Sequence, residues 1–177
     1  GFIKSWVGTI KNVTVENASL KTAGRSAVLA GNVYANIENC HVVNSTIEDS
    51  YWACGVIAGL YNSGSIKNCS VDGCSVKSNG GVGGIVGVIT ESSNRITASY
   101  SQGEVYGDFS PVSKQDEDYY AIGMVGYGSN YFELRDCYTL MNYSLVTRHG
   151  KNCYSIYDLV SEFSSPIYIA EIMRVNG

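Results

Sequence analysis

The stretch VIAGLYNSGSIKNCSVDG, Val56–Gly73, carries the two short patterns that decide the fold. The first is a tetrad of small and branched residues that ends in glycine. It occurs four times, at Val28–Gly31, Val56–Gly59, Gly84–Gly87 and Gly123–Gly126. The final glycines of the first three tetrads are 28 residues apart, at positions 31, 59 and 87. A constant period in this range is typical of solenoids, in which each unit packs on its neighbours.

A second pattern recurs five times at equivalent places in the repeat. Its copies are TIKNV, NIENC, SIKNC, RITAS and ELRDC, which begin at Thr9, Asn36, Ser65, Arg95 and Glu133. Counted from the isoleucine or leucine of each copy, small or branched residues recur at offsets 0, 3, 5, 8 and 10. Steps of 3, 2, 3 and 2 fit neither a helix nor one straight strand, because a strand alternates with a period of two. They are typical of short strands joined by tight bends.

These columns predict an all-β fold, a right-handed parallel β-solenoid of about five coils with a period of about 28 residues and a C-terminal cap. The right hand follows the usual hand of parallel crossover connections. Asparagine at offset 2, in Asn12, Asn39 and Asn68, fits a bend because Asn tolerates left-handed dihedral angles, and stacked amides can form a ladder. We expect a single domain over residues 1–177, with repeats at about 8–35, 36–64, 65–94, 95–132 and 133–155 and a cap at about 156–177.

Two segments resemble a known repeat family. Val56–Gly73 and GGVGGIVGV, Gly80–Val88, are similar to GLUG-type repeats. Such repeats occur in long surface proteins of bacteria, including gut Bacteroides-like anaerobes, and near the N-terminal regions of some IgA-cleaving metallopeptidases. The resemblance covers roughly residues 8–140 and implies a β-solenoid that serves as a spacer, an adhesin stalk or an accessory module. The fourth unit departs from the pattern, with ITAS at Ile96–Ser99.

The composition is typical of an exported β protein. The chain has 20 glycines, 2 prolines and 16% charged residues, which suits one continuous narrow core. Its net charge of −4 argues against a nucleic-acid partner. No apolar run reaches the length of a membrane span, and we expect any export signal to lie outside this stretch. Gly1–Ile3 reads like the tail of a preceding repeat strand, so we expect a fragment of a longer protein.

The spacing of the cysteines favours free thiols over a disulfide framework. Cys40 and Cys69 occupy one column on consecutive coils, so their side chains run in parallel rather than toward each other. We expect both to be buried and to behave as small hydrophobic residues. No Cys or His spacing indicates a metal site, and no cofactor is expected. A disulfide bond stays open among the three cysteines that share no column, which are Cys54, Cys74 and Cys153.

The sequence contains no known catalytic motif of the metallopeptidase, nucleophile-elbow or phosphate-loop kind. His41 is interpreted as an outward-facing, solvated strand residue. The glycines of Gly81–Gly84 are interpreted as packing positions, because no helix follows them. β-Helix enzymes that cleave polysaccharides carry acids on an exposed face, so Glu38 with Asp49, or Asp72 with its neighbours, is the alternative. Isolated acids on strand faces usually serve solubility, and we assign no catalytic residue.

An insertion of about ten residues within Gly107–Ala121 is the largest departure from the repeat. Loops on a rigid scaffold often carry recognition, and tyrosines beside acids suit contacts with sugars or proteins. Tolerated surface decoration is the alternative interpretation. Calcium is not expected, because consecutive acids without a glycine turn do not match a calcium loop. The candidate binding residues are Asp116, Glu117, Asp118, Tyr119 and Tyr120.

Eleven of the fourteen tyrosines lie from Tyr100 onward, which marks either a binding face or a covered terminal coil. The second interpretation is favoured because an open solenoid end needs a cap. Ser165 and Pro166 before an apolar run predict a short helix near Pro166–Arg174.

These features favour a non-enzymatic extracellular module of a bacterial surface protein, acting as a structural shaft or an adhesion segment. Its expected partners are a host glycan or protein ligand and other domains of the same chain. The alternatives are a carbohydrate-active β-helix enzyme or its accessory domain, and the non-catalytic repeat region of a surface peptidase. A cluster of acids with a base on one exposed face would favour the enzyme.

Overall fold

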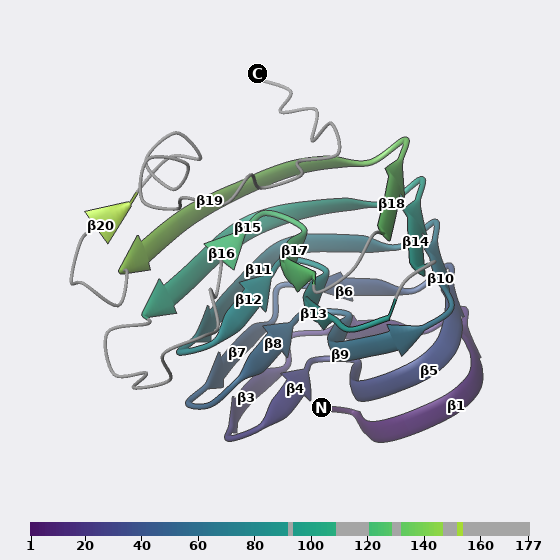
Figure 1. Cartoon of the computed structure of the whole chain (residues 1–177), viewed down its shortest axis with the longest axis horizontal. Coiled ribbons are helices and arrows are strands. Elements are labelled where there is room, and N and C mark those ends of the chain that lie inside the picture. The colour runs from purple at the N-terminus through teal and green to yellow at the C-terminus, as the bar shows by residue number, and fades with distance from the viewer. Residues whose placement is uncertain (92–93, 109–120, 129–131, 147–151, 154–177) are drawn as a thin grey trace.

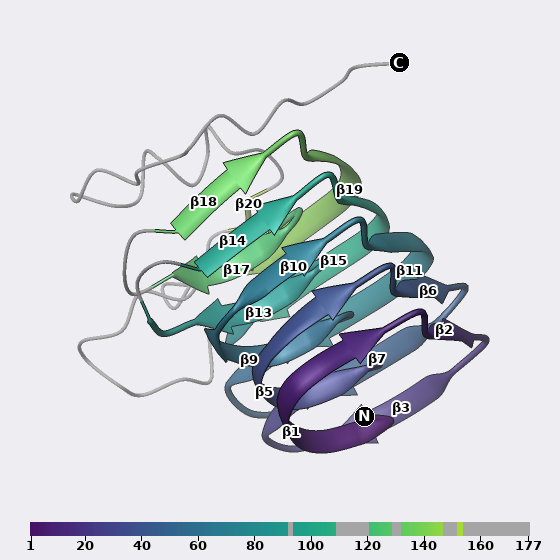
Figure 2. The same cartoon turned by 90° about the vertical axis from the view of Figure 1, so that its right-hand side faces the viewer.

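The computed structural model describes residues 1–91, 94–108, 121–128, 132–146 and 152–153. Within these ranges the chain forms strands and no helix. The strands of successive turns pair in parallel, and the described exception is β19 with β20, which is antiparallel. The fold is therefore the parallel β-solenoid expected from the sequence, with coils stacked on one another as Figures 1 and 2 show.

Three sheets run along the solenoid. Sheet A contains β1 (Ile3–Lys11), β5 (Ala30–Glu38), β9 (Ala58–Ser63), β10 (Ser65–Lys67), β13 (Val86–Ile89), β14 (Asn94–Thr97), β17 (Val125–Gly128) and β18 (Phe132–Arg135). Sheet B contains β2 (Thr14–Glu16), β3 (Ser19–Thr22), β6 (His41–Val43), β7 (Thr46–Asp49), β11 (Ser70–Ser78), β15 (Tyr100–Asp108), β19 (Tyr138–Val146) and β20 (Asn152–Cys153). Sheet C contains β4 (Arg25–Ala27), β8 (Ala53–Gly55), β12 (Gly81–Gly83) and β16 (Ala121–Ile122).

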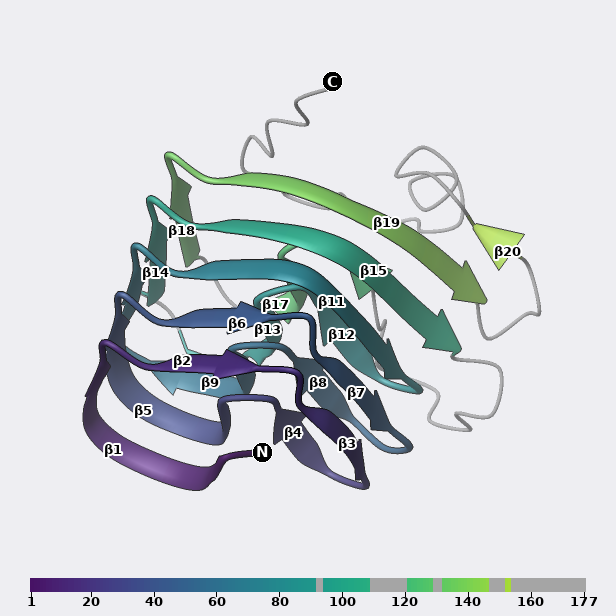
Figure 3. The ribbon, with the colours of Figure 1, turned by 180° about the vertical axis from the view of Figure 1, so that it is seen from behind.

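Each coil passes through sheets A, B and C in that order. In Figure 1 the chain runs from left to right along β5 and β9, and it returns behind them along β6 and β11, which Figure 3 shows from the other side. Because the coils rise from one to the next, this path is right-handed. The described residues complete about four coils, and β17, β18 and β19 add part of a fifth. The expectation of about five coils was slightly too high, because the five copies of the second sequence pattern have only four full repeats between the first and the last.

The inward columns are those read from the sequence. The offset-0 column is in register through sheet A, from Ile10 through Ile37, Ile66 and Ile96 to Leu134. The offset-5 column is in register through sheet B, from Val15 through Val42 and Val71 to Ser101. These residues are buried, except that Leu134 in the last coil is half-buried. Side chains of similar type stack on one another from coil to coil, so one narrow apolar core continues through the coils.

Asparagine forms the bend between sheets A and B, as the offset-2 column predicts. Asn12, Asn39 and Asn68 have left-handed φ angles of 57°, 51° and 52°. Their side chains form a ladder, since Asn39 donates to Asn12 and Asn68 donates to Asn39. A second left-handed bend divides sheet B at Asn17 and Asn44. The sequence analysis did not single out this second bend.

The glycine that ends each tetrad lies where sheet A packs directly on sheet C. A Cβ atom added to Gly59 would lie 2.5 Å from the backbone nitrogen and oxygen of Ser26 in β4. Gly87 in β13 meets the backbone of Cys54 in β8 in the same way. The contact is backbone against backbone, one coil apart, and leaves no room for a side chain. The tetrad is thus a steric requirement of the coil.

Candidate functional site

The insertion lies at the connection from sheet B to sheet C, which we call the B–C corner. This connection is two residues long in coil 1 (23–24), three in coil 2 (50–52) and two in coil 3 (79–80). In coil 4, which carries the insertion, it is twelve residues long (109–120). The two ends of the insertion, Asp108 in β15 and Ala121 in β16, are described and lie at this corner. The five candidate binding residues, Asp116–Tyr120, lie outside the described residues.

Asp49 builds the B–C corner of coil 2. Its side chain is 1% exposed and accepts a hydrogen bond from the Thr22 hydroxyl at 2.9 Å. Its carboxylate oxygens also accept the backbone amides of Gly24 at 3.2 Å and of Tyr51 at 2.7 Å. A buried carboxylate needs such donors to replace water. Asp49 therefore holds two neighbouring corners together, and its hydrogen bonds are structural.

Two aromatic residues, Tyr51 and Trp52, follow Asp49 at this corner. The Tyr51 side chain is 62% exposed. The guanidinium of Arg25 lies 5.1 Å from the centre of the Trp52 ring, and Trp52 also packs against the small apolar cluster of Ala53, Leu60 and Val88. An exposed tyrosine beside a cation-covered tryptophan suits contacts with polar ligands. The sequence analysis did not single out either residue, although the two adjacent aromatics, separated from Asp49 only by Ser50, are visible in the sequence.

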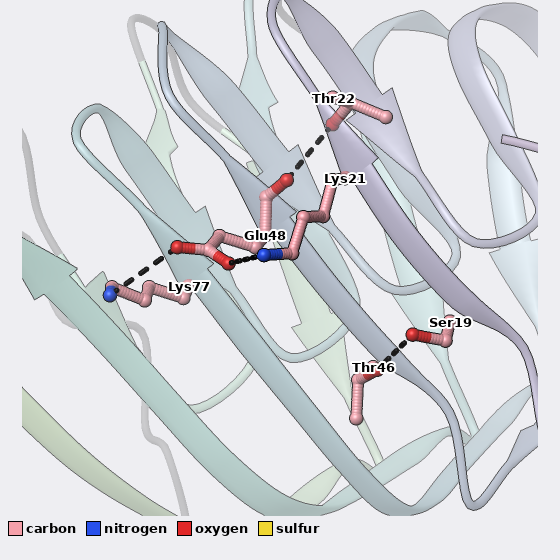
Figure 4. Close-up of polar contacts among 6 residues, drawn as sticks. All are labelled: Ser19, Lys21, Thr22, Thr46, Glu48 and Lys77. Carbon is pink, nitrogen blue, oxygen red and sulfur yellow. Dashed lines mark hydrogen bonds and ion pairs between the residues drawn. The ribbon is translucent and has the colours of Figure 1, made fainter.

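A charged row lies on the outer face of sheet B, as Figure 4 shows. Glu48 lies between two lysines, with its carboxylate 3.6 Å from Lys21 Nζ and 3.4 Å from Lys77 Nζ. Thr22 donates its hydroxyl to the Glu48 backbone carbonyl, and Thr46 donates to the Ser19 hydroxyl. Lys77 Nζ also lies 5.3 Å from the centre of the ring of Tyr106, which belongs to the following coil. The row connects three coils, although exposed ion pairs contribute at most about 1 kcal/mol each.

Glu38 and Asp49, which the sequence analysis considered as a catalytic pair, lie in different sheets. Glu38 ends β5 in sheet A, in register with Lys11 and Lys67. Asp49 ends β7 in sheet B, and Asp72 lies in β11 beside Val43. On sheet A the Glu133 carboxylate is held by two bases, Arg95 at 3.1 Å and Arg135 at 2.8 Å. Among the described residues, no group of three or more His, Cys, Asp or Glu side chains could hold a metal ion.

Cysteine directly follows a bend at Cys40, Cys69 and Cys74, whereas Cys54 lies within β8. Cys40, Cys54, Cys69 and Cys74 are buried free thiols, which confirms the prediction for Cys40 and Cys69 and answers the open disulfide question for Cys54 and Cys74. The Cys153 side chain lies outside the description. Cys69 Sγ lies 3.3 Å from the Lys67 carbonyl. Burial raises the pKa of Cys54 and of Cys74 above the usual 9.0, so both thiols are poor nucleophiles.

Serine fills the equivalent place one coil later. The Ser99 hydroxyl donates to the Thr97 carbonyl at 2.8 Å and accepts the backbone amide of Cys69 at 3.1 Å. Cysteine and serine are therefore equivalent at this bend. The other sequence features are also structural: His41 is half-buried and its Nδ1 lies 2.6 Å from the Ser70 hydroxyl, so it is less solvated than expected. Gly83 packs on the backbone of Gly126 and Met124, as the packing interpretation requires.

These features define a parallel β-solenoid with an insertion at one corner. Comparison with protein-family models, curated proteins and solved structures finds no match to this chain. The described residues form no helix that is long and apolar enough to cross a membrane.

Proposed function

We propose that this chain is a non-enzymatic, extracellular repeat module of a bacterial surface protein, serving as a structural shaft that carries a ligand-binding corner. The observation that carries the proposal is the in-register stacking of the inward columns through successive coils, as in Ile10, Ile37 and Ile66. Such stacking makes a rigid rod whose length grows with the number of coils. The GLUG-type resemblance of Val56–Gly73 supports the bacterial surface setting.

The outer faces favour a structural role over the polysaccharide-cleaving alternative. Glycoside hydrolysis usually needs two carboxyl groups that flank the scissile bond, with one of them able to donate a proton. Glu48 and Glu133 are each held between two bases, and Asp49 is buried in a network of donors. The carboxylate oxygens of these acids are thus engaged by partners within the chain, which favours a structural role for each.

The B–C corner is the part of the module that we assign to recognition. Its insertion brings Tyr119 and Tyr120 next to three acids in the sequence. The same corner exposes Tyr51 in coil 2. Aromatic rings supply rigid contact area, and carboxylates bond to hydroxyl groups, so a glycan or a protein loop is the expected ligand.

A glycan and mucin array probed with the purified chain tests this role, together with an assay for polysaccharide release. The proposal expects binding without release. Deletion of Ser110–Asp118 should weaken that binding and leave the circular dichroism spectrum unchanged, because loop closure depends weakly on loop length. Tyr51→Ala, in the same corner of coil 2, should also weaken binding if the exposed tyrosine belongs to the recognition surface. Release of sugar by the parent chain would show an enzyme and contradict the proposal.

A further inference from the structure

One row of side chains on the outer face of sheet A places a base in every second coil. This alternating row contains Lys11, Glu38, Lys67, Thr97 and Arg135, which are in register from β1 through β5, β10 and β14 to β18. These strands lie one above another in Figure 2. Because neighbouring coils are about 4.8 Å apart, successive bases of the row are about 10 Å apart along the solenoid.

The bases of the alternating row keep donors for a ligand. Lys11 and Lys67 are exposed, and the ion pairs of the described chain include neither of them. The Arg135 side chain is 69% exposed and its Nη2 lies 2.8 Å from the Glu133 carboxylate. Since a guanidinium carries several N–H donors, one such pairing leaves most of them available. Arg95, in the row beside, holds the other oxygen of Glu133 through Nε at 3.1 Å.

The rows on either side supply neutral hydrogen-bonding groups. They are the side chains of Thr9, Asn36 and Ser65 on one side, and of Asn12, Asn39 and Asn68 at the bend on the other. Such hydroxyl and amide groups both donate and accept hydrogen bonds. A sugar hydroxyl has the same two capacities, so these rows suit a ligand that is rich in hydroxyl groups.

The outer faces of sheets A and B carry opposite net charge. On sheet A, the alternating row and the row beside it that contains Arg95 and Glu133 carry four bases and two acids, a net charge of +2. The outer face of sheet B carries two bases and five acids, a net charge of −3, from Lys21, Lys77, Glu16, Glu48, Asp72, Glu104 and Asp108. An acidic ligand is therefore attracted to sheet A and repelled by sheet B.

We propose that the alternating row binds a linear acidic polysaccharide, which runs along the solenoid axis and carries a carboxylate on every second sugar. An extended sugar unit is about as long as one coil is high, so each sugar faces one coil. The acidic sugars then meet Lys11, Lys67 and Arg135. The neutral sugars between them meet Glu38 and Thr97, which bond to sugar hydroxyl groups. This face is separate from the B–C corner, and the inference does not depend on recognition by the insertion.

The two acids of this face argue against a denser polyanion. Duplex DNA carries one negative charge about every 1.7 Å along its axis. A polymer with charges so closely spaced would bring some of them against Glu38 and Glu133, where like charges repel. A chain with one acid in every second unit avoids Glu38, because a neutral sugar faces that coil.

A hyaluronan oligosaccharide as long as the row is the probe, because glucuronate alternates in it with a neutral sugar. A neutral chitin oligosaccharide and an oligogalacturonate, which has an acid on every sugar, are the comparisons. Calorimetric titration of residues 1–177 should give at least about tenfold tighter binding of hyaluronan than of either comparison, and salt should weaken it. NMR of the isotope-labelled chain should show shifts of the amides of β10 and β14 and none of those of β15.

Charge changes on the two faces give the matched variants. Lys67→Glu should weaken hyaluronan binding at least about tenfold, whereas Lys21→Glu, on the outer face of sheet B, should leave it unchanged. Glu38→Lys combined with Thr97→Lys puts a base in every coil and should shift the preference to oligogalacturonate. All of these side chains lie on outer faces, so folding is expected to survive, and circular dichroism checks it. Deletion of Ser110–Asp118 should not change the hyaluronan affinity, which separates this site from the B–C corner.

Four results would overturn the inference. Hyaluronan may bind no tighter than the neutral oligosaccharide, or Lys21→Glu and Lys67→Glu may weaken it equally. The variant with a base in every coil may keep the preference for hyaluronan, which would make the register irrelevant. A salt-sensitive dimer of the chain alone in sedimentation, lost in Lys67→Glu, would make the acidic sheet B of a second copy the occupant of this face.

Discussion

The side-chain amide of Asn68 donates to the side-chain carbonyl of Asn39 at 2.7 Å, while the two residues hold left-handed φ angles of 52° and 51°. One residue type thus meets two requirements, a strained bend and a bond between coils. In coil 4 the same bend is made by Ala98, at a φ of 47°. Alanine has no amide, so the ladder of Asn12, Asn39 and Asn68 ends there.

Replacing Ala98 should therefore stabilise the protein. A left-handed conformation costs an ordinary L-residue about 1–2 kcal/mol, and glycine avoids that cost. Ala98→Gly should raise the melting temperature through the backbone alone. Ala98→Asn should raise it by at least as much, because it adds about 1 kcal/mol of hydrogen bonding to the ladder. Thermal denaturation of the two variants separates the contributions, and a gain with Gly but none with Asn would show that the ladder contributes nothing.

Gly59→Ala should destabilise the fold strongly. The new methyl group would lie 2.5 Å from two backbone atoms of Ser26, and neither strand can move without breaking the stack. Overpacking of this kind costs about 1–3 kcal/mol or more. Urea denaturation measures the change. Ser63→Ala, at an exposed position of the same strand, is the control and should lie within about 0.5 kcal/mol of the parent. Equal stability of the two variants would contradict the backbone contact.

Ile66→Asp should abolish folding. The Ile66 side chain is fully buried between Ile37 and Ile96, so an aspartate there would place an unpaired charge between two coils at a cost of several kcal/mol. Lys67→Asp, one residue along and exposed, introduces the same charge outside the core and should fold. Circular dichroism compares the two. If both variants melted together, the column assignment would be wrong.

Cys69→Ser should be tolerated, because Ser99 already makes the same bend contacts in the next coil. We expect a loss of about 1 kcal/mol or less. Cys69→Val keeps the size and removes the bonding atom, so it should be the less stable of the two. In the parent chain, Cys40 and Cys69 should react with a thiol reagent only after denaturation. A disulfide between them in a mass map would contradict the free thiols.

Stability should fall as the pH rises above about 9. Burial, with a smaller contribution from the Asp49 charge, raises the pKa of Cys54 above its usual 9.0. The unfolded chain ionises this thiol at a lower pH than the folded chain does, so its contribution is complete below pH 9 and is lost as the pH rises toward the folded pKa. Burial raises the pKa of Tyr61 above its usual 10.0 with the same sign. We expect the free energy of unfolding, measured by urea denaturation at each pH, to fall less steeply with pH in Cys54→Ala than in the parent. An equal dependence on pH in the two proteins would exclude the thiol as a cause.

The sequence predicted the part of the fold that repeats by side-chain type. The spacing of Ile10, Ile37 and Ile66 and the asparagines two residues later was sufficient to give the sheet A register and the first bend. The second bend, at Asn17 and Asn44, has the same spacing and could have been predicted from the sequence. The reason for the tetrad glycines could not have been predicted. The contact of Gly59 with Ser26 is between backbones of different sheets, so it leaves no pattern of side chains.

The site was predicted less well. The insertion was located correctly, and its ends at Asp108 and Ala121 confirm the place where it leaves the coil. The loop residues themselves, Asp116–Tyr120, stay a prediction. Tyr51 and Trp52 were missed because they belong to coil 2, and only the stacking of coils brings their corner into line with the insertion. Sequence spacing shows which residues share a column, and it says little about which corners share a surface.

The glycine contact between sheets A and C also limits how such a gene can lengthen. Gly59 of β9 packs against the backbone of β4, and Gly87 of β13 packs against that of β8, so each of these tetrads fits the coil before it. Duplication of one whole unit would repeat contacts that already exist, whereas duplication of a partial unit would bring side chains onto backbone that accepts only glycine. Rods built this way should vary among related genes in steps of one complete turn, and an intermediate length should occur only where an insertion leaves the coil at a corner.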